Sequence, residues 1–156
     1  MKLKSILIVT LLLIGNVMFA QESTFTRGKG FLVRPELYGG FLVNVGYQFN
    51  PYFQVTVGAG VTIDPSTIAQ AGVRVYTNQG NWAGMIDYHY CRGNYHGTNN
   101  YGTTYSSRIT SHRLVGGASY KDLDFGGGLQ LVTLGSNIGL GPAITVGYNI
   151  RFYKHR

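Results

Sequence analysis

Residues 41–63 carry the feature that most restricts how this chain can fold. Apolar side chains occupy every second position on both sides of a turn at Asn50-Pro51-Tyr52. A period of two is that of a β-strand, so the segment predicts a β-hairpin with one apolar face. The other face carries mostly amides, hydroxyls and glycines, and no Lys, Arg, Asp or Glu. Because a face exposed to water is normally rich in charge, we expect the bulky face to contact lipid and the small polar face to line a narrow lumen.

The low share of charged residues indicates a domain whose surface is not fully exposed to water. Charged residues make up 12% of the 156 residues, about half of the average globular share of roughly 25%. The length fits one domain. The 23 glycines and the 13% of aromatic residues favour curved strands and interfacial rings over a helical core. The single cysteine, Cys91, excludes an intramolecular disulfide and is interpreted as a buried or lumen-lining thiol.

The N-terminus has the pattern of a secretory signal peptide. Lys2 and Lys4 precede an apolar run from Ile6 to Ile14, and a short segment then leads to Ala20. We predict a signal peptide over residues 1–20, a short periplasmic leader over 21–30 and a barrel over 31–156. An uncleaved anchor is the alternative. Loss of the two lysines leaves 11 of the 13 basic residues against 6 acidic ones, and because they are scattered we expect no nucleic-acid partner.

Alternation recurs along the rest of the chain and predicts further strands. The segment from Arg92 to Arg108 is the exception, because it contains no aliphatic residue and is expected to be a long solvated loop. The fold class predicted is all-β, an eight-stranded antiparallel up-and-down transmembrane β-barrel. Its strands are expected over residues 31–38, 41–49, 53–63, 69–76, 82–91, 113–120, 125–131 and 144–152.

The lengths of the connections predict the orientation of this barrel. With both termini in the periplasm, the second, fourth and sixth connections are periplasmic and short, and the longest connection is external, as in bacterial outer-membrane barrels. An external girdle would include Tyr38, Phe41, Tyr88 and Tyr90. A periplasmic girdle would consist of Phe31, Phe49, Tyr52, Phe53, Trp82, Tyr120, Phe125 and Phe152. Lipid-facing positions would include Val45, Val57, Val73, Ile86, Leu129 and Val146.

The same alternation directs charged residues into the lumen. Four cations cannot all pair with two anions, yet a buried ion needs a partner, hydrogen bonds or water. We hypothesise that Glu36 and Asp87 are each shared by more than one arginine, in a network that plugs the lumen. Alternatively, some of these residues lie at the rims. The predicted lumen set is Arg34, Glu36, Arg74, Asp87, Arg113 and Arg151, whereas Glu22, Asp64, Asp122 and Asp124 are assigned to the leader and to turns.

The C-terminal stretch from Thr145 to Phe152, TVGYNIRF, resembles the β-signal of outer-membrane proteins. Thr145 supplies the polar position, Gly147 the glycine, and Ile150 and Phe152 the closing apolar and aromatic positions. The stretch departs from that signal because four residues, 153–156, follow the aromatic.

With its signal peptide and eight strands, the mature chain resembles the small bacterial outer-membrane barrels, such as the outer-membrane protein X and protein A transmembrane-domain families. The resemblance implies Sec-type export to the outer membrane of a Gram-negative bacterium. It also implies contact with outer-membrane lipid and recognition of the last strand by the barrel-assembly machinery.

The first functional hypothesis is a non-enzymatic integral barrel that is structural or binds a partner, such as an envelope protein complex, through its external loops. Tyr95, His96, Tyr101 and Tyr105 are the candidate contact residues, because tyrosine among small polar residues is common in binding loops. A wide porin is not expected, because eight strands enclose an interior that side chains nearly fill.

Two alternatives come from other classes. An outer-leaflet lipid A-modifying enzyme would use Ser111 beside His112, but no acid is placed to orient that pair. A soluble periplasmic lipocalin-like barrel would need charged polar faces. A metal site from His89, Cys91, His96 and His112 would require three segments to converge, so we predict no metal, cofactor or catalytic residue.

Overall fold

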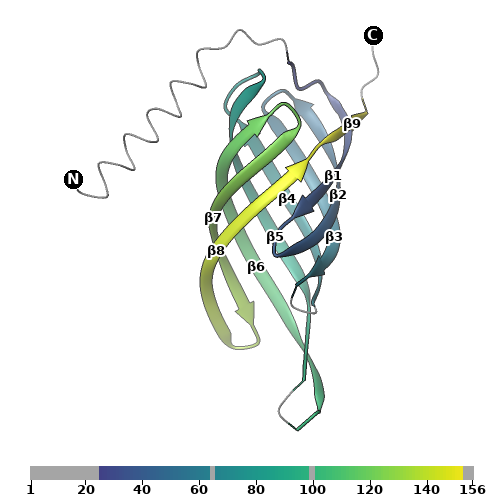
Figure 1. The fold of residues 1–156 in the computed structure, drawn as a ribbon, viewed down its shortest axis with the longest axis vertical. Coiled ribbons are helices and arrows are strands. Elements are labelled where there is room, and N and C mark those ends of the chain that lie inside the picture. The colour runs from purple at the N-terminus through teal and green to yellow at the C-terminus, as the bar shows by residue number, and fades with distance from the viewer. Residues whose placement is uncertain (1–24, 64–65, 99–100, 153–156) are drawn as a thin grey trace, which may run out of the picture.

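The computed structural model describes residues 25–63, 66–98 and 101–152, and these form a single antiparallel β-barrel (Figure 1). The predicted signal peptide, the first four residues of the leader (21–24), Asp64 and the last four residues lie outside this range, and Glu22 is among them. The strands are β1 (Gly30–Leu37), β2 (Gly40–Asn50), β3 (Phe53–Thr62), β4 (Ser66–Tyr76), β5 (Trp82–Thr98), β6 (Thr104–Tyr120), β7 (Leu123–Leu134), β8 (Asn137–Tyr148) and β9 (Ile150–Phe152).

β8 and β9 together form one strand of the ring, interrupted at Asn149. Val33 of β1 lies opposite Ile150 of β9, and Glu36 of β1 lies opposite Gly147 of β8, in one continuous register. The interruption at Asn149 lies opposite Arg34 of β1 and next to Pro35, which has no N–H to give to the ladder. β1 pairs with β2 on its other side, so the sheet closes into a ring of eight strands. The predicted eight-stranded up-and-down barrel is confirmed.

The two ends of the barrel differ. At the terminal end, where the described chain begins and finishes, the turns after β2, β4 and β6 are short. At the far end the β5–β6 hairpin extends furthest from the barrel (Figure 1). Within the described residues, no helix is long and apolar enough to cross a membrane.

The predicted long loop between Arg92 and Arg108 is wrong. β5 and β6 remain paired from Trp82 opposite Tyr120 to Thr98 opposite Thr104. A strand ladder needs backbone hydrogen bonds rather than aliphatic side chains, and the tyrosines and threonines of this stretch favour extended backbone. β8 likewise begins at Asn137, earlier than predicted, and its first residues pair with β7.

The predicted faces are observed along the barrel. Val57 is 55% exposed, whereas its neighbour Thr56 is 6% exposed and lies inside. The predicted lipid-facing set is exposed throughout: Val45, Val57, Val73, Ile86, Leu129 and Val146.

Aromatic rings gather on the outer surface at the terminal end. The rings of Phe31 and Tyr47 lie 4.9 Å apart, and those of Trp82 and Tyr120 lie 4.8 Å apart. Phe125 also contacts Trp82. Tyr38 was assigned to the other girdle, but it is buried inside the barrel, because it continues the inward phase of β1.

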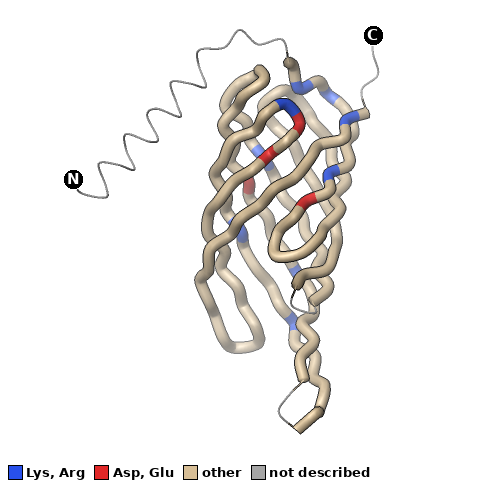
Figure 2. The backbone as a smooth tube through the Cα atoms, viewed as in Figure 1, with Lys and Arg blue, Asp and Glu red and all other residues tan. Residues whose placement is uncertain are grey.

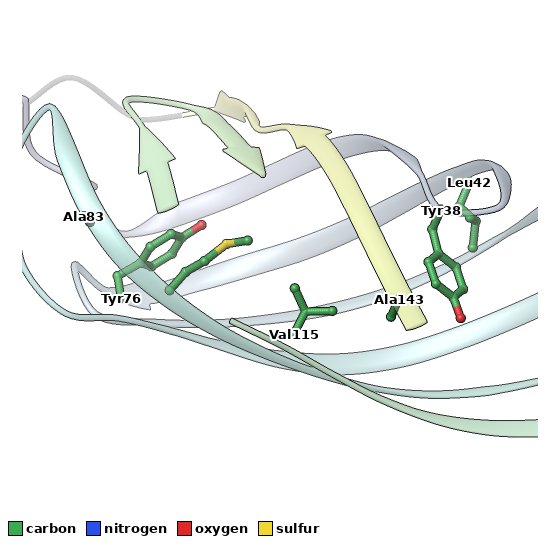
Figure 3. Packing of buried hydrophobic residues seen from close by; sticks show 7 residues of the cluster. Tyr38, Leu42, Tyr76, Ala83, Val115 and Ala143 are labelled. Carbon is green, nitrogen blue, oxygen red and sulfur yellow. The ribbon is translucent and has the colours of Figure 1, made fainter. Parts of the chain in front are cut away.

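A few apolar side chains fill the parts of the lumen that polar groups do not occupy. Figure 3 shows Tyr76 and Ala83 toward one end, Tyr38 and Leu42 toward the other, and Val115 between them. The middle of the barrel between these groups is mainly polar.

Candidate functional site

A charged network crosses the lumen of the barrel. The predicted lumen residues Arg34, Glu36, Arg74, Asp87 and Arg113 are all at most 2% exposed. Figure 2 shows the acidic positions on several strands, in the half of the barrel nearer the two chain ends. The network is therefore built by residues that are far apart in the sequence.

Glu36 on β1 is the most completely bonded carboxylate. Its Oε1 accepts hydrogen bonds from Arg113 Nη2 at 2.6 Å and from Thr145 Oγ1 at 2.9 Å. Its Oε2 accepts from Arg34 Nε at 3.3 Å and from Asn44 Nδ2 at 3.1 Å. One carboxylate thus connects β1 to β2, β6 and β8.

Asp124 at the start of β7 is the second shared carboxylate. Its Oδ2 accepts from Arg34 Nη1 and from Arg74 Nη1, the latter at 2.8 Å. Asn149 Nδ2 donates to the same oxygen at 2.7 Å, and the Tyr76 hydroxyl at 3.2 Å. These contacts span the barrel from β4 to β7 and β1.

Asp87 on β5 contacts a single arginine, Arg74 of the neighbouring strand β4. The expectation that Asp87 is shared by two arginines is therefore wrong. Its second neighbour is His89, whose Nδ1 lies 3.2 Å from Asp87 Oδ1 and 2.9 Å from Arg113 Nη2. His89 Nδ1 therefore lies between the Asp87 carboxylate and the Arg113 guanidinium, and its Nε2 lies 3.1 Å from Thr56 Oγ1.

The central part of the network is balanced in charge. We call Arg34, Arg74, Arg113, Glu36, Asp87 and Asp124 the inner cluster, and it contains as many arginines as carboxylates. Its hydrogen bonds reach Asn44 on β2 and Thr145 on β8 directly, and they reach Thr56 on β3 through His89, so the network includes every strand of the ring. Such a cluster avoids the cost of an uncompensated buried charge.

Two further arginines occupy the terminal end. Arg151 contacts Asp122 and also donates to Gln48 Oε1 at 2.9 Å. Arg27 precedes β1, is fully buried, and donates to Ser119 Oγ at 2.9 Å and to the Lys121 carbonyl at 3.3 Å. Burial lowers the pKa of Arg27.

Arg27 also ties the terminal end together. Its guanidinium lies 4.4 Å from the centre of the Tyr76 ring, a cation–π contact, and it donates to the carbonyls of Asn78 and Gly80. These contacts join the leader to the turns that follow β4 and β6.

Glycines leave the space that these large side chains need. A Cβ at Gly147 would overlap the guanidinium of Arg34, and a Cβ at Gly72 would overlap the ring of His89. Gly147 belongs to the predicted assembly signal, so in this fold the same glycine also accommodates the lumen network. In that signal Thr145 points inward, and Ile150 and Phe152 point outward.

Sequence reasoning missed Asp124, which was assigned to a turn. Asp124 is fully buried and lies opposite Ser119 in the β6–β7 ladder. The signal was present in the alternation, because Asp124 has the same parity as Gln130, which also faces inward. Arg27 carried no such signal, since the leader is not a strand.

The other candidate residues do not form a common site. The rings of Tyr95 and Tyr105 lie 6.2 Å apart on the β5–β6 hairpin, whereas Tyr101 is 94% exposed at its tip. His96 is exposed on the outer face of β5. Cys91 is buried and donates to Gln70 Oε1 at 3.6 Å.

Ser111 and His112 point to opposite sides of β6. Ser111 faces the lumen, whereas His112 is exposed and accepts from or donates to the Tyr88 hydroxyl at 2.8 Å. A catalytic pair would require both side chains on one side. In the described part of the chain, no group of three or more His, Cys, Asp or Glu side chains could hold a metal ion, so the histidines and Cys91 do not converge.

Comparison with solved structures supports this architecture. The crystal structure of the N-terminal β-barrel domain of Pseudomonas aeruginosa OprF is similar, with a TM-score of 0.55 over 79% of this chain and 100% of that domain. The sequence identity is 10%, so the likeness concerns the fold alone. No family model matches the chain, and no curated protein matches its sequence. The chain has the fold of a small outer-membrane β-barrel, as its sequence predicted.

Proposed function

We propose that this chain is a non-enzymatic integral β-barrel of the Gram-negative outer membrane, with a lumen closed by the inner cluster. The proposal rests on the distribution of apolar and charged side chains, which is the reverse of that in a soluble protein. The outward face is apolar around the ring, while buried arginines and carboxylates fill the inside. A soluble lipocalin-like barrel would present the opposite arrangement, with its apolar side chains inside.

The orientation follows from the two ends. The terminal end, with its aromatic rings, is the periplasmic side, and the far end, from which the β5–β6 hairpin extends, is external. Recognition of the strand that ends at Phe152 by the barrel-assembly machinery belongs to the same proposal.

The external β5–β6 hairpin is the proposed contact surface for a protein partner in the envelope. Tyr101 at its tip is exposed, and the rings of Tyr95 and Tyr105 pack over Gly97. Tyrosines held by a paired hairpin lose little conformational entropy on binding. Non-enzymatic action is supported by the separation of Ser111 from His112 across the wall.

Planar-bilayer recordings test the closed lumen. We expect the unmodified protein, purified from outer membranes, to give no large steady conductance, because the inner cluster fills the lumen. Joint replacement Glu36→Gln and Asp87→Asn should lower stability or release small currents that favour anions, since arginines then remain unpaired. Asp122→Asn, which changes the rim pair alone, is the matched control.

Two results would reject the proposal. Large steady conductance in the unmodified protein would show that the lumen is open. Recovery of folded protein in the soluble periplasm, without detergent, would favour the lipocalin-like alternative.

A further inference from the structure

Beyond the inner cluster, toward the far end, the side chains that line the lumen become mainly apolar. The Arg113 guanidinium lies 3.9 Å from the centre of the Tyr38 ring, so this tyrosine caps the charged network. Past Tyr38 the inner walls carry Ile68, Ile109 and Val132, which line a cavity of about 390 Å³. A cavity of this size lies within the range of small-molecule sites. Its walls are mainly apolar, unlike the polar lumen beneath, and Thr62, Ser66 and Gln130 add polar groups to them.

The wall beside this cavity is incomplete. β1 pairs with β8 only as far as Leu37 opposite Val146, and the chain then turns at Gly39, which has a positive φ of 51°. β8 continues in the other direction to Asn137, paired with β7. Figure 1 shows the β1–β2 hairpin ending well before the β7–β8 hairpin. One edge of β8 therefore faces a lateral gap.

The cavity passes through this gap to the outside of the barrel. Its lining includes Pro142 and Ile144 of β8 together with the inward-facing Ser111. Ile144 points outward and is 72% exposed. Proline within a sheet is typical of edge strands, so Pro142 suits a strand whose edge has no neighbour here.

The surroundings of the gap indicate what enters it. Ile138, Leu140 and Ile144 on the outer face of β8 are each at least 70% exposed, which places lipid beside the opening if the proposed function holds. Pure hydrocarbon against the β8 edge would leave backbone N–H and C=O groups without partners, at a cost of several kcal/mol each in general. An occupant that joins a hydrocarbon chain to a polar group satisfies both surfaces.

We propose that the cavity binds one hydrocarbon chain of an amphiphile, which enters sideways between β8 and the β1–β2 hairpin. The chain lies against Ile68, Ile109 and Val132, and the polar end stays at the free edge of β8. Tyr38 forms the floor and separates the chain from the inner cluster. The chemistry is that of an acyl lipid or a free fatty acid.

Other occupants fit less well. An added peptide strand would pair with the β8 edge but would leave the cavity behind it empty. A second copy related by a two-fold axis along the membrane normal would cross its β8 over this one at about 70–90°, because barrel strands tilt by about 35–45°. Crossed edges cannot form a ladder.

Fluorescence quenching tests the proposal in the full chain. Trp82→Phe removes the native tryptophan, and Tyr95→Trp then places a reporter on the cavity wall. The protein is folded into phosphatidylcholine vesicles with dibrominated acyl chains or, separately, into unbrominated vesicles with added dibromostearic acid. Because a ligand in a site of this kind buries most of its surface, we expect at least about twofold quenching of the reporter in one of the two arms.

Two variants serve as controls. Ile138→Trp, in the same Trp82→Phe background, reports lipid on the outer face. Gly141→Phe should obstruct the cavity and reduce quenching at residue 95 while leaving quenching at residue 138 unchanged. A Cβ at Gly141 would meet only the Gln130 side chain, at 3.8 Å, so a side chain can start at this position without overlapping the backbone.

The outcomes separate the two proposals. Quenching at residue 95 by brominated phospholipid identifies a membrane lipid, and quenching only by dibromostearic acid identifies a free fatty acid; either supports the site. Quenching at residue 138 but not at residue 95 in both arms overturns the site, because water or a protein partner must then occupy it. Absence of quenching at both positions in both arms overturns membrane insertion as well.

Discussion

Replacing Glu36 by glutamine removes the negative charge that two arginines share. The amide keeps the size of the side chain but can accept hydrogen bonds on one atom only, and its other atom becomes a donor facing further donors. If the amide nitrogen takes the place of Oε2, Arg34 and Asn44 lose their acceptor. If it takes the place of Oε1, Arg113 and Thr145 lose theirs. The inner cluster acquires one uncompensated positive charge.

The size of the effect follows from burial. Glu36 and Arg113 are fully buried, so water cannot replace the lost carboxylate. Removing one partner of a buried ion pair generally costs about 3–5 kcal/mol. We therefore expect Glu36→Gln to lower the free energy of unfolding by about 3–5 kcal/mol.

Urea unfolding in phospholipid vesicles measures this change. Trp82, the single tryptophan, lies among the rings of the terminal end and reports unfolding by its fluorescence. Asp122→Asn is the comparison, because the Asp122 side chain is 22% exposed although its partner Arg151 is 2% exposed. With water reaching the Asp122 side of the pair, we expect a smaller loss than for Glu36→Gln.

A double variant makes the test specific to charge. Arg113→Gln together with Glu36→Gln restores the balance of the inner cluster, so the pair should be less destabilised than the sum of the single variants. If the two effects simply add, or if Glu36→Gln shifts stability by less than about 0.5 kcal/mol, charge pairing does not stabilise the lumen.

Two further substitutions test the walls. Val57→Arg should cost roughly 2–4 kcal/mol in vesicle unfolding because it places a charge in lipid, whereas Thr56→Val should cost less; equal tolerance at both positions would contradict the assigned faces. Gly147→Ala should lower the free energy of unfolding by about 1–3 kcal/mol, because its Cβ displaces the Arg34 guanidinium. Gly139→Ala is the control and should be nearly neutral, because a Cβ there meets open space. Similar losses in the two variants would count against this packing.

The sequence predicts the structure best in the strands, where each side chain faces either the lipid or the lumen. In β2 and β3 every second side chain faces lipid, so the period of two predicted both strands and their faces. Arg34, Glu36 and Arg113 could be assigned to the lumen by the same argument. The alternation does not depend on any distant part of the chain.

Cross-barrel partners could not be predicted in this way. Asp124 pairs with Arg34, 90 residues away, and that contact depends on the stagger of the closed ring, which no local pattern encodes. The composition of residues 92–108 does not reveal the β5–β6 extension, because backbone pairing needs no aliphatic residues. The lateral gap likewise depends on where β1 turns relative to β8.

The closing seam between β1 and the last strand has a consequence for folding kinetics. Glu36 in the first strand accepts from Thr145, 109 residues later, so the first charges to be inserted acquire their full set of partners only when the last strand arrives. Contacts this distant in sequence slow folding. Intermediates that lack the last strand have both an open edge and uncompensated charge, so the barrel should assemble in one cooperative step, and a chain truncated before Asn137 should not accumulate as a stable partial barrel.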